Sequence, residues 1–551
     1  MVRSNTRQAI SAVSMIALSA VFAAGTSAAA QDRPTAMPHI ASQDGHHALI
    51  VDGAPFVMLG AQANNSSNYP WALPKVWPVL DQLHANTLEI PVAWQQVEPV
   101  EGQFDFSWVQ TLLDQARAHD KRLVLLWFGT WKNTTPNYTP AWVLTDNHRF
   151  PRMKKPDGSD SYVLSPMYQS TLDADNRAFV ALIAYLKAHD PQNTVLMVQV
   201  ENETGSYGNP RDYAPKAQAL FDGPVPAALA RALHKQPGTW AQMFGDQADR
   251  DFNTWYTARY VDQIAAAGKA VKPIPMYANA ALAGAFGTPK PDAVSSGGPQ
   301  WDVLDIWKAA APAIDLEAPD IYDAKSADVA AYLDHYDRPD NPLMVPEMGN
   351  SKKFARYFWE VLGHGAIGFS PFGMDATGYF NYPLGGGKIG PDVIDPFARN
   401  YALIAPMDRE WAQIAFTHRT WGCARPDDGA AQSETMGGWT ITAKYGQWQF
   451  GPDEDDAGRK DAPPWASQPI GGCLVAQLDP DTFLVTGDHV RLHIAASAKG
   501  PAHPLMIRVE QGHFDHGKWV MDRVWNGDLT DYGLNFIDTP YLLKVTMGSY
   551  R

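Results

Sequence analysis

Between residues 50 and 415, short apolar runs alternate with amphipathic segments, and this alternation restricts the fold more than any other feature of the chain. A strand followed by a helix, repeated along the chain, predicts parallel strands with crossover helices. A (β/α)8 barrel fits this length better than an open doubly wound sheet, and no glycine-rich nucleotide fingerprint follows any run. The runs that resemble buried strands begin at Phe56, Thr87, Arg122, Thr194, Ile274, Ile314, Pro342 and Ala366.

The pattern of apolar and polar residues changes after Ala415. Segments such as "GWTITAKYGQWQFG" and "TFLVTGDHVRLHI" alternate apolar and polar residues between Gly, Asp and Pro. Short strands at this spacing are typical of an antiparallel sandwich. We therefore predict an α/β catalytic barrel over residues 31–415, followed by a smaller all-β, sandwich-like domain over residues 416–551. The Pro/Gly/Ala-rich stretch 192–254 predicts a long loop over the mouth of the barrel.

Residues 1–30 have the layout of a secretory signal peptide. Arg3 and Arg7 precede the apolar stretch 10–24, and the alanines at 28–30 offer a cleavage site. The apolar stretch is short for the roughly 20 residues that a membrane-spanning helix needs. We expect the protein to be exported, either to a periplasm or fully secreted.

Composition narrows the classes of partner. The net charge is -15 without long acidic runs, which argues against a nucleic-acid partner. No later segment is long and apolar enough to predict a membrane span, and no Cys/His cluster has metal-ligand spacing, so we expect no metal and no cofactor. Export permits a disulfide between Cys423 and Cys473, but their spacing leaves open whether they meet. The sequence also leaves the oligomeric state open.

Two predicted strands end in carboxylates. The fourth strand runs into Glu201, Asn202 and Glu203, and the seventh ends at Glu347. Barrels carry their functional residues at these carboxyl ends, and buried carboxylates without partners are costly. Either glutamate alone is most simply a rim charge held by Arg or Lys. As a pair they suit glycoside hydrolysis, in which one carboxyl is the general acid and the other the nucleophile, about 5–5.5 Å apart.

Three motifs resemble glycoside hydrolase family 35, the β-galactosidase family. They are "QVENETGSYG" from Gln199, "VAWQQVEPVEGQFDFS" from Val92, and the shorter "VPEMGN" from Val345. The resemblance covers about residues 56–415, and the C-terminal part is similar to the β-rich domain of one bacterial branch. It implies a barrel enzyme that hydrolyses with retention of configuration.

The resemblance also implies roles for individual residues. Glu203 would be the acid/base and Glu347 the nucleophile, while Asn202 would bind the 2-hydroxyl of the sugar. Glu201 could share the face of Glu203 and touch substrate, or support the strand by hydrogen bonding. Tyr322, at the end of the sixth strand, could orient Glu347 or serve in packing.

The segment after the third strand departs from the family pattern. It reads "WFGTWKN", residues 127–133, without the glutamate that holds galactose hydroxyls in family members, and Pro91 replaces a usual tyrosine. Trp131 could stack on the sugar, Asn133 could contact its hydroxyls, and Trp94 stands at the end of the second strand; alternatively, residues 130–133 only shape the loop. The leading prediction is a retaining exo-β-galactosidase acting on oligosaccharides. A β-glucosidase or a non-catalytic carbohydrate-binding barrel remain alternatives.

Overall fold

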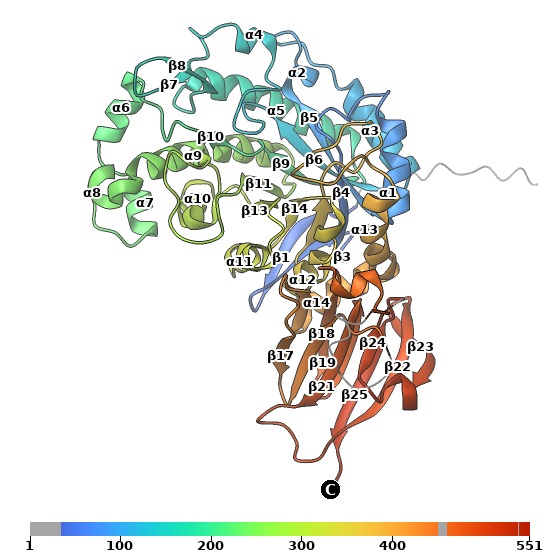
Figure 1. Ribbon diagram of the computed structural model, residues 1–551. Helices are drawn as coiled ribbons and strands as arrows, with labels where there is room; N and C mark the ends of the chain where they lie inside the picture. Colours follow the sequence, from blue (N-terminus) through green and yellow to red (C-terminus); the bar gives the residue numbers. More distant parts are fainter. Residues whose placement is uncertain (1–34, 450–459, 538) are drawn as a thin grey trace, which may run out of the picture.

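A closed barrel of parallel strands forms the larger part of the computed structural model, which describes residues 35–449, 460–537 and 539–551 (Figure 1). Its hydrogen-bonded order is β11-β13-β14-β15-β4-β5-β6-β9, so β15 closes the barrel on β4. The predicted barrel is confirmed, and each predicted run contains one of its strands. These are β4 (Met58–Gln62), β5 (Thr87–Ala93), β6 (Arg122–Phe128), β9 (Val195–Val200), β11 (Met276–Ala281), β13 (Leu316–Ile321), β14 (Val345–Met348) and β15 (Gly368–Pro371). The predicted signal peptide lies outside the described residues.

Helices follow the strands and cover the outside of the barrel. Their apolar positions recur three and four residues apart, as in α3, where Val109, Leu112, Leu113 and Ala116 are buried. Helix by helix they are α1 (Trp77–Leu83), α3 (Ser107–Ala118), α5 (Gln169–His189), α9 (Ala248–Val271), α10 (Leu304–Ala310), α11 (Ser326–Tyr336), α12 (Tyr357–Gly363) and α13 (Pro391–Ile404). Within the described ranges, no helix combines the length and the apolar character needed to cross a membrane.

The stretch after β9, predicted as a loop, contains three short helices on one side of the barrel (Figure 1). They are α6 (Pro215–Asp222), α7 (Ala227–Ala232) and α8 (Trp240–Phe244). Pro215 opens α6, where its missing N–H costs nothing, and Gly223 ends it. Thr239 caps α8 in a capping box with Gln242. The prediction was wrong because the Pro and Gly residues here mark helix ends.

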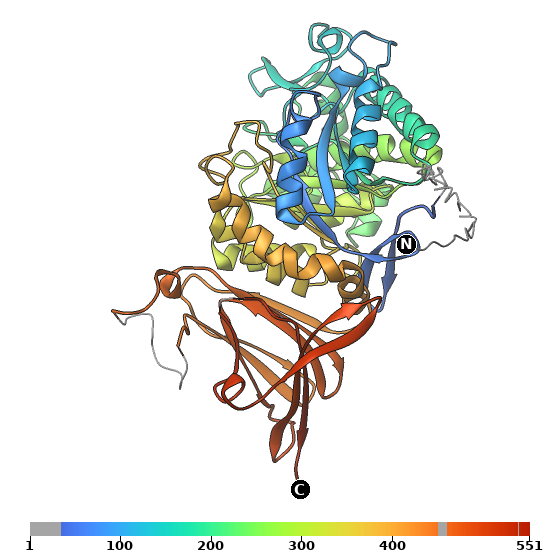
Figure 2. The same ribbon diagram turned by 90° about the vertical axis from the view of Figure 1, so that its right-hand side faces the viewer.

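The C-terminal part consists of two antiparallel sheets, as predicted (Figure 2). A shared core that includes Trp439, Phe483 and Leu492 lies between them. Cys423 and Cys473 face each other across β16 and β19, and both are free thiols. One sheet is β16 (Thr420–Ala424), β19 (Gly472–Asp479), β20 (Thr482–Asp488), β25 (Leu543–Ser549), β22 (Pro504–Asp515) and β23 (Lys518–Trp525); the other is β17 (Gln432–Met436), β18 (Trp439–Tyr445), β21 (Val490–Ala496) and β24 (Leu534–Phe536).

The six-stranded sheet packs on the barrel through α12 and α14 (Asp408–Thr417). The contact is close, because a Cβ on Gly363 would collide with the backbone of Gly422. Trp359 is fully buried there. An ion pair of 2.7 Å joins Arg356 of the barrel to Asp427. Apolar residues of both parts, including Trp359 and Leu474, belong to one buried cluster, so the two parts share a continuous apolar contact.

Candidate active site

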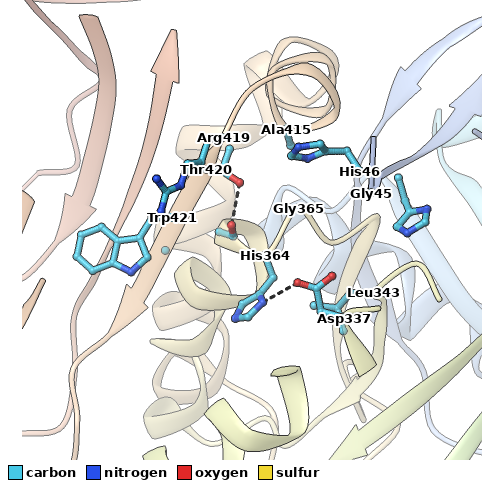
Figure 3. Close-up of a pocket in the computed structure, with 13 residues that line it drawn as sticks. Gly45, His46, Asp337, Leu343, His364, Gly365, Ala415, Arg419, Thr420 and Trp421 are labelled. Atoms are coloured by element: carbon cyan, nitrogen blue, oxygen red, sulfur yellow. Dashed lines mark hydrogen bonds and ion pairs between the residues drawn. The ribbon is translucent and has the colours of Figure 1, made fainter. Parts of the chain in front are cut away.

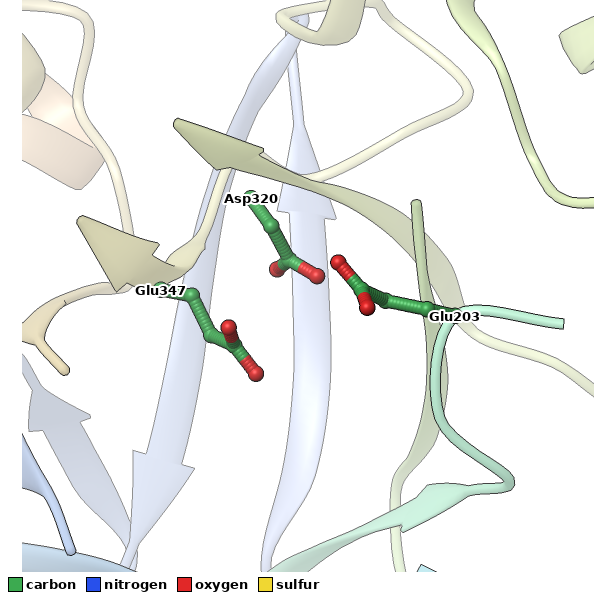
Figure 4. Close-up of side chains that lie close together, drawn as sticks. All are labelled: Glu203, Asp320 and Glu347. Atoms are coloured by element: carbon green, nitrogen blue, oxygen red, sulfur yellow. The ribbon is translucent and has the colours of Figure 1, made fainter. Parts of the chain in front are cut away.

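A cavity of about 530 Å³ opens at the carboxyl ends of the barrel strands. Glu203, Asp320 and Glu347 project into it from three different strand ends (Figure 4). Asn133 and Tyr322 also line it. The barrel thus brings together Glu203, Glu347, Tyr322 and Asn133, four of the residues predicted from the sequence.

Glu203 stands on a tight turn that follows β9. Its φ is 46° and that of Glu201 is 66°, a left-handed conformation that non-glycine residues rarely adopt. Hydrogen bonds hold this turn from two sides. The Glu203 N–H donates to Asn279 Oδ1 at 3.0 Å, and the Glu203 carbonyl accepts from the Thr134 N–H at 2.9 Å. The turn aims the Glu203 carboxyl into the cavity.

Glu347, on β14, is buried and well supplied with donors. Tyr322 Oη donates to one carboxylate oxygen at 2.8 Å. Gln62 Nε2, at the end of β4, donates to the other at 2.8 Å, and Asn202 Nδ2 lies 3.4 Å from the same oxygen. Donors on both oxygens fix the orientation of the carboxylate and stabilise its negative charge. The orienting contact predicted for Tyr322 is present.

Asp320 is a third carboxyl of the site that the sequence reasoning missed. It pairs in register with Glu347 across β13 and β14 and accepts a 2.6 Å hydrogen bond from Asn279. One oxygen each from Glu203, Asp320 and Glu347 lie within 4.8 Å of one another. Three carboxylates so close could also ligate a cation. We interpret Glu203 and Glu347 as a catalytic pair, because amide and hydroxyl donors already hold both oxygens of Glu347 and Asn279 holds one oxygen of Asp320.

Crowding of these carboxyls changes their titration. Burial, followed by the charge of Glu347, raises the pKa of Glu203 to about 7, against the opposing charge of Lys132. Burial and the charges of Glu347 and Glu203 hold the pKa of Asp320 well above its usual value. Near neutral pH Glu203 is therefore poised to give or accept a proton.

Lys132 is buried in the wall of the cavity and donates to Asn202 Oδ1 at 2.8 Å. This contact fixes the amide of Asn202, whose nitrogen then faces Glu347. Lys132 thus supplies positive charge among three carboxyls. It lies in the segment after β6, which lacks the glutamate of the family pattern described above.

Three predicted substrate contacts are not supported by the structure. Glu201 is fully buried, and its carboxyl accepts from the Trp131 N–H at 2.7 Å instead of lining the cavity. The left-handed turn explains this, since it breaks the alternation that would place Glu201 and Glu203 on one face. Trp131 is buried against Tyr260. Trp94 is buried too and donates to Glu98 at 2.9 Å.

A second cavity, of about 280 Å³, lies at the opposite end of the barrel, because residues that precede β14 and β15 line it. Figure 3 shows its lining residues, some of which belong to β16. Burial lowers the pKa of His364 there, but its 2.9 Å hydrogen bond with Asp337 and the neighbouring acidic groups outweigh burial, so the pKa is raised overall. Amino-terminal faces of such barrels serve stability, so we place no chemistry in this cavity.

The barrel and its paired strand-end carboxyls define a candidate glycoside hydrolase. Residues 76–271 match the model of glycoside hydrolase family 42, described as beta-galactosidase. That range contains Asn202 and Glu203 and ends before Glu347. The comparison supports a glycoside hydrolase of the β-galactosidase type. The predicted family is wrong, because the model that matches is that of family 42 and not family 35.

Other similarities cover parts of the chain. Residues 397–537 match a domain of unknown function, DUF5597. The beta-galactosidase BgaA of a Thermus species is 28% identical over 164 residues, 28% of this chain and 23% of BgaA, so the chain spans less than a quarter of that relative.

Solved structures that are similar include two beta-galactosidases. One is a beta-galactosidase from the psychrophilic Marinomonas ef1, with 12% identity, coverage of 66% of this chain and 62% of that chain, and a TM-score of 0.48. The other is Gan42B, a GH42 beta-galactosidase from G. stearothermophilus, with 15% identity, coverage of 72% and 60%, and a TM-score of 0.48.

Proposed function

We propose that this protein is a retaining exo-β-glycosidase that removes terminal β-galactosyl residues from oligosaccharides. The observation that carries the proposal is the spacing of Glu203 and Glu347, which bring oxygen atoms within 4.8 Å of one another. Retaining glycosidases need their carboxyls about 5–5.5 Å apart, whereas inverting enzymes need more room for a water molecule. The match of residues 76–271 supports galactose as the sugar.

The site supports a double displacement. Glu347 attacks the anomeric carbon, while Glu203 donates its proton to the departing glycosidic oxygen. The covalent bond joins the sugar to a Glu347 oxygen, and the leaving group departs as a neutral alcohol. Glu203, now ionised, takes a proton from water as that water attacks the anomeric carbon and releases Glu347.

A panel of nitrophenyl β-glycosides tests the sugar assignment. We expect kcat/KM to be highest on the β-galactoside and to be lost in Glu347→Gln. Glu101→Gln is a matched control, because Glu101 is an exposed carboxylate paired with Arg149 at 2.6 Å. A higher kcat/KM on the β-glucoside than on the β-galactoside would mean that the protein is a β-glucosidase. Absence of turnover on every glycoside would favour a non-catalytic binding barrel.

We also propose that the protein is exported, on the evidence of residues 1–30 alone. N-terminal sequencing of protein from the exported fraction should find a start near Gln31. An intact Met1 in that fraction would contradict the proposal.

A further inference from the structure

A second pair of carboxyls lies buried behind the catalytic turn. Asp175 of α5 and Glu201, two residues before the acid/base, are both fully buried, and Glu201 Oε1 and Asp175 Oδ1 border the same small space beside Gly129. Tyr260 of α9 is a further titratable group against them, since its hydroxyl lies 3.4 Å from Asp175 Oδ2. Two ionised carboxylates that are fully buried side by side are very costly, so the pair must hold a proton.

The surrounding donors show which carboxyl holds that proton. Both oxygens of Asp175 accept hydrogen bonds: Oδ1 from Trp127 Nε1 at 2.9 Å, and Oδ2 from the Thr130 N–H at 3.0 Å and the Thr130 hydroxyl at 2.6 Å. Glu201 accepts through Oε2 alone, from the Trp131 N–H, and among the described residues no donor serves its Oε1. Asp175 is therefore the carboxylate, and Glu201 Oε1–H donates to it.

The pair connects two segments that carry the active site. Asp175 holds the segment after β6 through Thr130, and Glu201 holds it through Trp131. The same segment continues into Lys132, while Glu201 leads directly into Asn202 and Glu203. Gly129 leaves the space for the pair, because a Cβ there would lie 2.6 Å from Glu201 Oε1 and 2.7 Å from Asp175 Oδ1.

We propose that Glu201 and Asp175 form a one-proton carboxyl clamp, with the proton on Glu201, that positions the acid/base turn against the segment carrying Lys132. Neither residue touches substrate; both act through Glu203, Asn202 and Lys132. The effect of the clamp on catalysis rests on the proposed function. The placement of the proton rests on the hydrogen-bond donors around the two carboxyls and is independent of that function.

The two amide variants report where the proton lies. In Glu201→Gln, the amide nitrogen can donate to Asp175 and the amide oxygen can still accept from Trp131. We expect kcat/KM within about threefold of the wild type, since no hydrogen bond is lost. In Asp175→Asn, one oxygen must be replaced by a donor that faces Trp127 or Thr130. We expect kcat/KM to fall about tenfold or more, mainly through kcat.

The pH dependence of thermal unfolding tests the clamp without any substrate. A protonated Glu201 in the folded state has a pKa above its unfolded value of about 4.3, so the folded protein binds more protons above that pH. Its contribution to the free energy of unfolding is therefore lost as pH rises. Glu201→Gln removes this dependence, and its Tm relative to the wild type should rise with pH.

Three outcomes would overturn the clamp. A Tm difference that is constant with pH would mean that Glu201 does not hold a proton. A milder loss for Asp175→Asn than for Glu201→Gln would place the proton on Asp175. Wild-type kcat/KM in both variants would remove the positioning role. If the wild type hydrolyses no glycoside, the proposed function fails, while the pH dependence of Tm still decides whether the buried pair holds a proton.

Discussion

Activity on substrates with poor leaving groups should fall above pH about 7, because Glu203 must then give up the proton that it donates. The pKa of Glu203 is raised to about 7, with burial and the Glu347 charge as the first two causes. At one pH unit above the pKa about one molecule in eleven still carries the proton, and at two units about one in a hundred. The loss in kcat/KM should therefore approach tenfold per pH unit.

The fall in kcat/KM above pH about 7 is the alkaline limb of the pH profile. Lys132→Met should shift this limb in a known direction. Lys132 lowers the pKa of Glu203, so removing its charge raises that pKa further. The alkaline limb should move to higher pH by about one unit, even though kcat also falls because Asn202 loses its 2.8 Å partner. Lys187→Met, on the exposed surface of α5, is the matched control and should leave the limb in place.

The assay compares two β-galactosides from about pH 5 to about pH 9. A galactosyl oligosaccharide needs protonation of its leaving oxygen, whereas a dinitrophenyl galactoside does not. We expect the limb with the first substrate only. An identical limb for both substrates would refute Glu203 as the acid, and an unmoved limb in Lys132→Met would refute the electrostatic argument.

Four further predictions concern other parts of the molecule. Glu347→Gln should lower kcat at least about 10⁴-fold on every glycoside, since Glu347 is the carboxylate of the site whose two oxygens are both held by donors for attack; substantial residual turnover would displace it as nucleophile. Tyr322→Phe removes a 2.8 Å hydrogen bond to that carboxylate and should slow release of the sugar about tenfold, seen as a burst of the first product; steady kinetics without a burst would leave Tyr322 a packing residue. A chain ending at Thr417 should be insoluble, because it uncovers Trp359 and the apolar contact beside it; a soluble, fully active product would show that the all-β part is dispensable. Asn133→Ala should change the ratio of kcat/KM on β-galactoside and β-glucoside, and an unchanged ratio would remove Asn133 from specificity.

The barrel could be predicted because its strands are short apolar runs whose length and spacing are local properties. β5 is buried at every position, as parallel strands covered on both faces must be. Glu203 and Glu347 could be predicted as site residues for the same reason. A carboxylate at the end of a buried apolar run can be recognised from the neighbouring residues alone. That the two carboxyls lie in one site could be predicted from topology alone, because the parallel strands of a barrel all end at the same mouth.

Asp320 was missed because its importance depends on register. The segment "APDIYD" places it two residues before Tyr322 and so on the same face, a pattern that could have indicated it. Only the closed barrel sets Asp320 beside Glu347 across β13 and β14. The substrate contact predicted for Glu201 was wrong for a related reason. The left-handed conformations of Glu201 and Glu203 break the alternation that would place both side chains on one face of the strand.

The charge of Lys132 changes how the sugar can be held. A glutamate in its segment would be a fourth carboxyl beside Glu203, Asp320 and Glu347, and like charges at this range resist joint ionisation. Lys132 instead offsets their charge, and one of its N–H groups already donates to Asn202.

The acceptor that a glutamate would offer to galactose hydroxyls must then come from another group of the cavity wall. Asn133 is the exposed amide in this segment that lines the cavity. An amide can accept from one hydroxyl and donate to another, so it tolerates either orientation of the 4-hydroxyl better than a carboxylate does. Discrimination between galactose and its 4-epimer should therefore be weaker here than in a site built around a glutamate.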